Sequence, residues 1–475
     1  MTTPIKFGTD GWRAIIAEDF TFPNVRAVAQ SVALYLKEAG LAQRGLVVGY
    51  DTRFASEDFA AAVAEVVAAN GIHVYLCDRS APTPVVGYSI LDRKAGGSVV
   101  ITSSHNPAQW SGFKFRPEYG GSAPPEVLAQ IEAHIPEAVA SGAVERLPLL
   151  EAKARGLVET FDPRPPYRRQ VARLVDLDFL RAAGLRAVVD SMHGAAAGYI
   201  RQQLSGGKTQ VREIRAARNP LFPRMHNPEP IARNLAPLTQ AVRRHNADVG
   251  LATDGDGDRL GVVDERGEFL NQHQVFALLA YYLLEVRGQR GPLVKSLTTS
   301  RMIQSLGKLY GVPVFETPVG FKFLGPKMVA EDAIVAGEES GGYAFRGHLP
   351  ERDGVVSALY FLDLMARRGR RPSELLAELY EKVGPHFYDR IDIQLAPEKA
   401  PALRERLVRA RPDRIAGLAV TAADTTDGFR FSLEGDGWVL FRFSGTEPLL
   451  RIYTEVQDEA LVAKVLQAGR DLVGV

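Results

Sequence analysis

The segment Asp248–Val263 reads DVGLATDGDGDRLGVV and joins two apolar runs through an acidic loop. The first run, Asp248–Thr253, predicts a buried strand, and the second run, Leu260–Val263, has the same strand-like character. The glycines between them allow a tight turn in which carboxylate oxygens point inward. The segment therefore predicts two strands of an α/β fold with a functional loop between them. That loop is Asp254-Gly-Asp256-Gly-Asp258-Arg259.

Three carboxylates at alternate positions of this loop can converge on one hard cation. Because three unpaired anions so close together repel one another, a divalent metal is the simplest compensation. A calcium-binding EF-hand requires a Glu at loop position 12, and Glu265 occupies that position when counting starts at Asp254. The strand-like run that begins at Leu260 nevertheless argues against a calcium loop that leads into a helix. A solvated acidic turn is the other alternative.

Strand-like runs alternate with helical stretches on the N-terminal side of this loop. Asn24–Gly40 predicts an amphipathic helix, Gly45–Asp51 a buried strand, and Ser56 a cap for the helix that follows. Ile72–Asp78 and Ser98–Thr102 predict two further strands. Such alternation is typical of βαβ units around a mainly parallel sheet.

The alternation restarts at Leu185–Asp190 and again in the helix after Asn271. The last part differs, because FSLEGDGWVLFRF (431–443) predicts a hairpin and a helix closes the chain. We therefore expect three related α/β domains with mainly parallel mixed sheets, followed by a smaller α+β domain. The expected boundaries are 1–162, 163–267, 268–384 and 385–475.

Length and composition are ordinary for a globular protein of several domains. The chain has 475 residues, which corresponds to three or four domains at roughly 100–200 residues each. Its formal net charge of +1 gives no reason to expect a nucleic acid or a membrane as partner. Cys77 is the only cysteine, so an intrachain disulfide cannot form. The first residues lack the pattern of a signal peptide, and we expect a cytoplasmic protein.

Another polar segment, Thr102-Ser-Ser104-His105-Asn106-Pro107, follows the predicted strand Ser98–Thr102. In open α/β sheets, ligand sites lie beyond the carboxyl ends of such strands. A serine hydroxyl beside a histidine can act as a nucleophile or carry a phosphoryl group. Ordinary turn chemistry is the alternative explanation for this segment.

Three more segments have residue types that suit a sugar phosphate. Arg442-Phe-Ser444-Gly445-Thr446-Glu447-Pro448, with Arg451 beyond it, can form a phosphate cradle or a solvated turn. Gly337-Glu338-Glu339-Ser340-Gly341-Gly342 can bind vicinal sugar hydroxyls or be a polar turn without a ligand. Near the N-terminus, Arg13 can meet a phosphate or pair with Asp10.

These segments occur in an order that resembles the α-D-phosphohexomutase family, which includes phosphoglucomutases, phosphomannomutases and phosphoglucosamine mutases. The resemblance covers essentially the whole chain and depends on the Ser-His-Asn-Pro, DGDGDR, GEESGG and SGTEP motifs together. It implies three related α/β domains and a smaller fourth domain around a central cleft. It also implies that phosphoryl groups move between C1 and C6 of a hexose phosphate through a hexose 1,6-bisphosphate, which serves as activator.

The resemblance further implies a role for individual residues. Ser104 matches the serine that carries the phosphoryl group, and one of its phosphate oxygens would complete a Mg²⁺ site with Asp254, Asp256 and Asp258. The basic residues around the reacting group would be His105, Arg13, Lys114 and Arg259. The contacts to the sugar and to its second phosphate would come from Glu338, Ser340, Lys322, Arg442, Ser444, Gly445, Thr446 and Arg451.

The sugar loop departs from one branch of the family. Many bacterial phosphomannomutase/phosphoglucomutase and phosphoglucosamine mutase members have His where this chain has Gly342, and Glu339 precedes Ser340 here as in phosphoglucomutases. We therefore expect glucose 1-phosphate and glucose 6-phosphate as substrates, with mannose or glucosamine phosphates as the alternative. The general acid/base stays open among His105, Lys114 and Lys322.

Two alternatives come from other functional classes, namely a metal-dependent sugar phosphatase and a catalytically silent sugar-phosphate binding protein. A P-loop kinase is disfavoured because the sequence contains no GxxxxGK[ST] motif. The expected assembly is a monomer or a homodimer.

Overall fold

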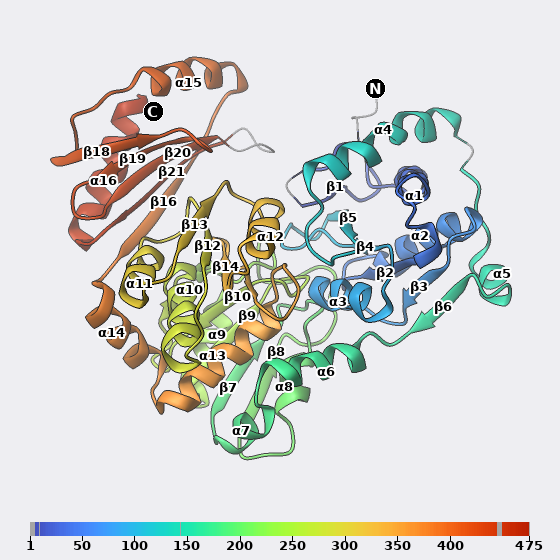
Figure 1. Ribbon diagram of the computed structural model, residues 1–475, viewed down its shortest axis with the longest axis horizontal. Coiled ribbons are helices and arrows are strands. Elements are labelled where there is room, and N and C mark those ends of the chain that lie inside the picture. Colours follow the sequence, from blue (N-terminus) through green and yellow to red (C-terminus); the bar gives the residue numbers. More distant parts are fainter. Residues whose placement is uncertain (1–4, 9, 143, 444–448, 475) are drawn as a thin grey trace.

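The computed structural model describes residues 5–8, 10–142, 144–443 and 449–474. Within these residues, β-sheets lie in four consecutive parts of the chain (Figure 1). The first three sheets are mixed and the last is antiparallel, as the sequence predicted. The domain boundaries themselves stay a prediction.

The first sheet is buried between helices on both of its faces. On strand β2 (Leu46–Tyr50), Val48 packs with the apolar side chains of α1 (Phe22–Glu38) and α2 (Ser56–Ala69), whereas Val47 packs with those of α3 (Thr83–Arg93). The continuous apolar runs follow from this two-sided burial. The sheet order is β1 (Trp12–Ile15), β5 (Trp110–Pro117), β4 (Gly97–Ile101), β2, β3 (Val74–Cys77) and β6 (Val158–Phe161), with α4 (Pro125–Ser141) and α5 (Leu149–Ala154) nearby in the chain.

One local expectation in this part is wrong. Ser56 does not cap α2, because the cap position is Ala55 in the left-handed conformation and Ser56 is the first helical residue. The hydroxyl of Ser56 instead donates to Asp51 Oδ1 at 2.9 Å. The Ser56 hydroxyl therefore bonds to Asp51, the residue after β2, instead of capping the helix.

The second sheet carries the acidic loop between two of its strands. Strand β9 (Val249–Thr253) and strand β10 (Leu260–Val263) are antiparallel neighbours and are fully buried, which confirms the strand prediction and removes the EF-hand alternative. The sheet order is β11 (Phe269–Leu270), β10, β9, β7 (Arg186–Asp190) and β8 (Gln210–Ile214). The helices of this part are α6 (Arg164–Leu174), α7 (Leu177–Ala182), α8 (Tyr199–Leu204) and α9 (Ala236–Arg244).

The third sheet lies against the long buried helix α13 (Gly354–Arg368), whose first twelve residues are all buried. Asn271 caps α10 (Gln272–Tyr281) in a capping box with Gln274, which fixes where this helix starts. The sheet order is β13 (Val314–Thr317), β12 (Leu293–Ser296), β14 (Val335–Gly337) and β15 (Tyr343–Phe345). The other helices of this part are α11 (Met302–Tyr310), α12 (Phe321–Ala330) and α14 (Pro372–Val383). In the chain as a whole, short helical segments occur at Ala42–Arg44, Ala232–Asn234, Tyr282–Val286 and Pro397–Lys399.

The fourth sheet packs its strands against α16 (Glu459–Val473) and meets the third sheet through a small apolar cluster. Leu297 of the third part packs there with Trp438, Leu440 and Tyr453. Glu316 also forms an ion pair with Arg430 at 2.6 Å across this contact. The sheet order is β16 (Phe387–Gln394), β21 (Leu449–Val456), β20 (Trp438–Phe443), β19 (Phe429–Leu433), β18 (Leu418–Asp424) and β17 (Arg414–Ile415), and α15 (Ala400–Arg409) follows β16.

The remaining expectations about the chain as a whole concern the thiol and the membrane. Cys77 is buried, and this burial raises the pKa of its thiol. Among the described residues, no helix combines the length and apolar character that a membrane crossing requires.

We predict that Phe276→Ala destabilises the third part of the chain by about 3–5 kcal/mol, because it empties a large buried volume. Phe276 is fully buried on α10, its ring stacks on Tyr343 at 5.5 Å, and it fills the space directly under Gly337 at the end of β14. Urea unfolding monitored by circular dichroism measures the loss.

Leu309→Ala on α11 is the matched control, because the Leu309 side chain is 51% exposed. We expect the control to change stability by no more than about 0.5 kcal/mol. Equal effects of the two substitutions would contradict the described packing of α10 under the third sheet.

Candidate active site

The acidic loop between β9 and β10 holds three fully buried carboxylates. Asp254, Asp256 and Asp258 each offer an oxygen, and these oxygens lie within 4.8 Å of one another. Oδ1 of Asp256 and Oδ1 of Asp258 accept no hydrogen bond from the described residues, whereas Oδ2 of Asp258 forms an ion pair with Arg352 at 3.0 Å. Buried carboxylate oxygens without donors are the ligands that a hard divalent cation requires. The loop therefore fits a metal ion.

Two glycines of this loop allow it to approach its neighbours closely. A Cβ atom at Gly255 would lie 2.5 Å from the carbonyl oxygen of Ser104. Gly257 has a φ of +74°, which a residue with a side chain rarely adopts. The acidic loop and the serine loop therefore pack backbone against backbone.

The three carboxylates have different proton affinities. Burial, together with repulsion from Asp258 and Asp256, raises the pKa of Asp254 well above its usual value. Burial would also raise the pKa of Asp256, but the nearby ammonium of Lys114 and the hydroxyl of Thr83 outweigh it and lower that pKa. Mutual repulsion in a buried loop is relieved when a cation binds, which gives the loop a driving force for metal binding.

Ser104 lies in the loop after β4 of the first sheet and contacts the acidic loop, which belongs to the second sheet. Its hydroxyl donates to Asp254 Oδ2 at 3.0 Å and lies 3.2 Å from Nδ1 of His105. The backbone φ of Ser104 is +50°, an uncommon value for a serine. This conformation is held because the Ser104 N–H donates to Thr102 Oγ1 at 2.9 Å.

Arg53 holds the serine loop in place, and the sequence analysis did not identify it. This fully buried guanidinium pairs with Asp51 at 3.2 Å. It also donates to four loop carbonyls, those of Ser104 (2.7 Å), Asn106 (2.6 Å), Pro107 (2.9 Å) and Trp110 (3.0 Å). The sequence contained one signal for Arg53, namely its position. Asp51-Thr52-Arg53 directly follows strand β2, which pairs with β4 in the sheet, and ligand sites lie beyond the ends of such strands.

The predicted basic residues surround the two loops. Lys114 lies 2.8 Å from Asp10 and 2.9 Å from Asp256. Burial would lower the pKa of Lys114, but Asp10, Asp256 and Asp258 outweigh burial and raise it. Lys114 therefore remains a fixed positive charge, which suits charge stabilisation better than proton transfer.

Arg13 lies near Asp10, one of the two partners that the sequence left open, and it also contacts the serine loop. Its guanidinium donates to Asn106 of the serine loop at 2.6 Å and lies 4.0 Å from Asp10. Arg259 pairs with Glu229 at 2.8 Å. Burial, followed by the positive charges of Arg259 and Arg13, lowers the pKa of His105 well below its usual value. His105 is therefore neutral at neutral pH, with its ring within hydrogen-bond distance of Ser104 Oγ.

Arg352 links the acidic loop to other segments, and sequence reasoning missed it. Its guanidinium lies 2.8 Å from Asp10, 3.0 Å from Asp258 and 3.0 Å from Glu351. Arg116 completes this network by pairing with Asp10 at 3.1 Å and Glu351 at 2.7 Å. Apart from the adjacent Glu351, these partners come from segments far apart in the chain, so no local motif marks them.

The GEESGG segment follows β14 and contacts the acidic loop through its backbone. The Leu260 N–H donates to the Gly341 carbonyl at 2.9 Å, and Arg259 forms a β-bridge with Gly342. Ser340 donates its hydroxyl to Glu338 Oε2 at 3.3 Å. Lys322 lies at the start of α12, with its ammonium over the ring of Phe323 at 5.3 Å.

The fourth predicted segment is only partly described. Ser444, Gly445 and Thr446 lie outside the described residues. On either side of them, Arg442 and Arg451 are directly opposite one another in the β20–β21 ladder. Arg442 donates to Asp427 at 3.1 Å, and Arg451 lies 3.8 Å from Asp392. Two cations therefore flank the predicted phosphate loop.

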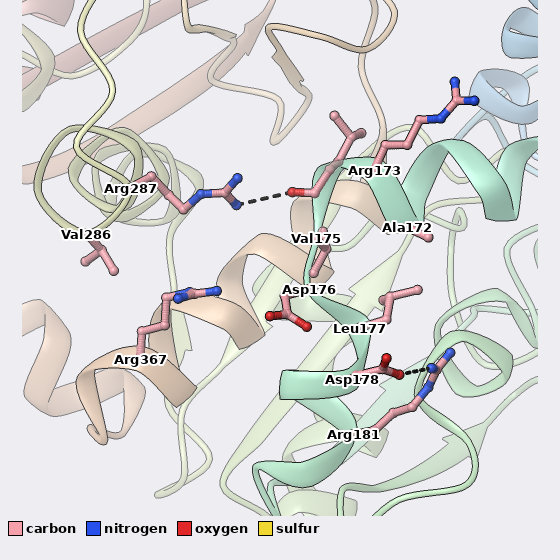
Figure 2. A pocket seen from close by; sticks show the side chains of 11 residues that line it. Ala172, Arg173, Val175, Asp176, Leu177, Asp178, Arg181, Val286, Arg287 and Arg367 are labelled. Atoms are coloured by element: carbon pink, nitrogen blue, oxygen red, sulfur yellow. Dashed lines mark hydrogen bonds and ion pairs between the residues drawn. The ribbon is translucent and has the colours of Figure 1, made fainter.

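A surface pocket of about 670 Å³ lies elsewhere, between α6–α7 and α13 (Figure 2). Three of the four arginines that line it have partners, since Arg287 donates to the Leu174 carbonyl, Arg367 to Asp363 and Arg181 to Asp178. The predicted site residues do not line this pocket. This pocket is therefore separate from the predicted site at the loops.

Comparison with known families agrees with this arrangement. Four models match, and all describe parts of phosphoglucomutase/phosphomannomutase: α/β/α domain I at residues 4–140, α/β/α domain II at 165–267, α/β/α domain III at 271–383 and the C-terminal domain at 403–472.

Individual relatives cover nearly the whole chain. A phosphoglucomutase/phosphomannomutase of Thermococcus kodakarensis is 30% identical over 98% of both chains. A phosphoglucosamine mutase of Solidesulfovibrio magneticus is 31% identical, again over 98% of both chains. A crystal structure from Thermus thermophilus, provisionally assigned as a phosphomannomutase, superposes with a TM-score of 0.87 at 36% identity over 100% of both chains.

A more distant structure shares the fold alone. It is an N-acetylphosphoglucosamine mutase of Aspergillus fumigatus in complex with GlcNAc-6P and magnesium. It has a TM-score of 0.60 at 15% identity and covers 99% of this chain and 96% of its own.

We predict that Mg²⁺ stabilises the protein through the acidic loop and that Asp258→Asn abolishes this effect. At a concentration about 100 times the Kd, a ligand of the folded state adds about 2.7 kcal/mol. Thermal unfolding with and without Mg²⁺ measures the effect. Asp178→Asn is the control, because the Asp178 side chain is 92% exposed and distant from the loop. A Mg²⁺ response that survives in Asp258→Asn would contradict the metal site.

We further predict that Arg53→Lys loosens the serine loop. Lysine keeps the charge opposite Asp51 but cannot form the fork of donors that reaches four carbonyls. Hydrogen exchange in residues 104–110 should become at least about tenfold faster, which corresponds to about 1.4 kcal/mol. Arg79→Lys on the surface should leave this loop unchanged, and unchanged exchange in both variants would contradict the role of Arg53.

Proposed function

The chain belongs to the phosphoglucomutase/phosphomannomutase family, and from this premise we propose that it interconverts glucose 1-phosphate and glucose 6-phosphate. The observation that carries the proposal is the meeting of Ser104 with the acidic loop, where its hydroxyl donates to Asp254 at 3.0 Å. A phosphoryl group on this oxygen would lie beside the carboxylates that fit a metal ion.

In the proposed reaction, phosphorylated Ser104 transfers its group to the free hydroxyl of a hexose monophosphate. The bond between phosphorus and Ser104 Oγ breaks and a bond from phosphorus to the sugar oxygen forms. The sugar hydroxyl gives its proton to a base of the site, and Ser104 Oγ takes up a proton to become a hydroxyl. The resulting hexose 1,6-bisphosphate turns over in the site and returns its other phosphoryl group to Ser104. A trace of added bisphosphate would serve as activator, because it can phosphorylate Ser104 in molecules that have lost the phosphoryl group.

The residues around Ser104 suit this transfer. His105 is neutral and close to Ser104 Oγ, so we assign it the proton transfer that the sequence left open among three residues. Lys114 and Arg13 supply fixed positive charge for the oxygens of the moving group. Mg²⁺, held by Asp254, Asp256 and Asp258, would neutralise charge on that group. The magnesium complex of the distant Aspergillus fumigatus mutase supports this choice of metal.

The rest of the sugar phosphate would be held by the other two segments. Glu338 and Ser340, with Lys322 nearby, would contact the sugar hydroxyls in both orientations of the bisphosphate. The phosphate that is not reacting would be held by Arg442, Ser444, Gly445, Thr446 and Arg451. Mannose and glucosamine phosphates are the alternative substrates, and relatives with these names support them.

A sugar phosphatase is the second candidate reaction. The acidic loop alone would be sufficient for a phosphatase. Such an enzyme would release inorganic phosphate instead of forming an isomer. The placement of Ser104 against Asp254, and the contact between GEESGG and the metal loop, favour the mutase.

We predict that the protein isomerises glucose 1-phosphate in the presence of Mg²⁺ and a trace of glucose 1,6-bisphosphate. Ser104→Ala should lower kcat on the order of 10⁴–10⁶-fold, because it removes the oxygen that carries the phosphoryl group. A coupled assay for glucose 6-phosphate measures the rate, and intact mass detects a phosphoryl group on the wild type and not on the variant.

Ser103→Ala is the matched control for this measurement. The Ser103 hydroxyl is buried one residue away and has no hydrogen-bond partner among the described residues, so its loss should change kcat less than about threefold. Release of inorganic phosphate without isomerisation would favour the phosphatase. Full activity of Ser104→Ala would overturn the proposed mechanism.

A further inference from the structure

The sugar loop, GEESGG at 337–342, is tied to the fourth part of the chain through Glu339. Its Oε1 accepts hydrogen bonds from Arg390 at 2.7 Å and from the Tyr388 hydroxyl at 3.0 Å. Both donors lie on β16, the first strand of the fourth sheet. Burial would raise the pKa of Glu339, but Arg390 and His273 outweigh it and lower that pKa. An ionised carboxylate therefore anchors the sugar loop to β16.

A row of alternating charges continues from Arg390 toward the arginines that flank the predicted phosphate loop. Arg390 also lies 3.4 Å from Asp392, which is two residues further along β16. Asp392 is opposite Arg451 in the β16–β21 ladder, and their charged atoms are 3.8 Å apart. Arg451 in turn is opposite Arg442 in the next ladder. Because opposite residues of a ladder share one face of the sheet, these charges form a continuous row that begins at Glu339.

Arg442 is joined to the third part of the chain by a separate contact. It donates to Asp427 Oδ1 at 3.1 Å, and the Val319 N–H donates to Asp427 Oδ2 at 3.0 Å. Val319 lies between β13 and α12, three residues before Lys322. Both arginines beside the predicted phosphate loop are therefore linked to segments of the third part that carry a proposed sugar contact.

We propose that Arg390 is a positioning residue that holds the sugar loop in register with the two arginines beside the predicted phosphate loop. The inference rests on the proposed function, because it takes the sugar contacts from Glu338 and Ser340 and the second phosphate contact from these arginines. In this role Arg390 acts through Glu339 and Asp392 and not on the reacting atoms.

The physical reason for such a residue is that the two contacts come from different sheets. One hexose phosphate would touch both segments at once, and it loses less freedom on binding when their separation is already fixed. These contacts are made to the part of the substrate that does not react, so they are present before and during the transfer alike. Loss of the register therefore raises KM and leaves kcat nearly unchanged.

The test measures kcat and KM for glucose 1-phosphate in the full-length protein with Mg²⁺, together with hydrogen exchange of residues 337–342 in the ligand-free protein. Arg390→Met removes the charge and keeps most of the side-chain length. We expect KM to rise about tenfold and kcat to change less than about threefold. Exchange in the sugar loop should become about tenfold faster, because its anchor on β16 is lost.

Glu339→Gln removes the charge at the other end of the ion pair and keeps the shape of the side chain. It should reproduce the effects of Arg390→Met, and it tests the same contact if Arg390→Met does not fold. The double variant Glu339→Gln/Arg390→Met should be no more impaired than the single variants, because residues that act through one contact are not additive.

Arg430→Met is the matched control, because it breaks an ion pair between the same two sheets that does not include the sugar loop. Arg430 pairs with Glu316 at 2.6 Å, and Glu316 retains a second cation, Lys295, at 3.4 Å. We expect this control to leave KM and the exchange of residues 337–342 unchanged.

The outcomes separate this inference from the proposed function. If the wild type does not isomerise glucose 1-phosphate, the proposed function fails, and the inference fails with it. If the wild type is active but KM and the exchange of the sugar loop are unchanged in both Arg390→Met and Glu339→Gln, the inference alone is overturned. Equal effects of Arg430→Met would also overturn it, because they would reflect a general loosening between the two sheets.

Discussion

The constraint on which the rest of this structure depends is the burial of Asp254, Asp256 and Asp258 in one short loop. Three carboxylates without water are tolerated only where cations and donors surround them. Lys114 comes from the first part of the chain and Arg352 from the third, and both form ion pairs with the acidic loop. Residues from separate sheets therefore meet at this loop. The contact between the sheets is therefore partly electrostatic, in addition to the shared apolar core.

The same burial explains why the serine loop is built so rigidly. Ser104 Oγ lies within hydrogen-bond distance of Asp254, and in the proposed transfer a misplacement of about 1 Å would be costly there. Arg53 restrains the loop by donating hydrogen bonds to four of its carbonyls, and Gly255 allows the backbones of the two loops to pack closely. Much of the site is thus made by backbone placement, with few side chains left to reorganise.

Sequence reasoning predicted the parts of this site that are local in the chain. The DGDGDR and Ser-His-Asn-Pro segments each follow a strand, and the rule for strand ends places Ser104 and Asp254 at ligand-binding edges. Arg53 and Arg352 were missed because many of their partners are distant in sequence and because a lone arginine has no motif. The hydroxyl of Ser56 was misjudged for a related reason, since its bond to Asp51 replaced the cap. Domain boundaries depend on weak contacts between parts, which periodicity does not reveal.

The opposed arginines of the β20–β21 ladder have a thermodynamic consequence for ligand capture. Arg442 and Arg451 repel one another across the strands, and each has its own aspartate neighbour, Asp427 or Asp392. This repulsion is overcome during folding, so the cations are in place before any anion arrives. Under the proposed function, a phosphate bound beside these arginines would relieve the repulsion and would lose little entropy in arranging side chains, so the sheet itself would contribute to the binding free energy.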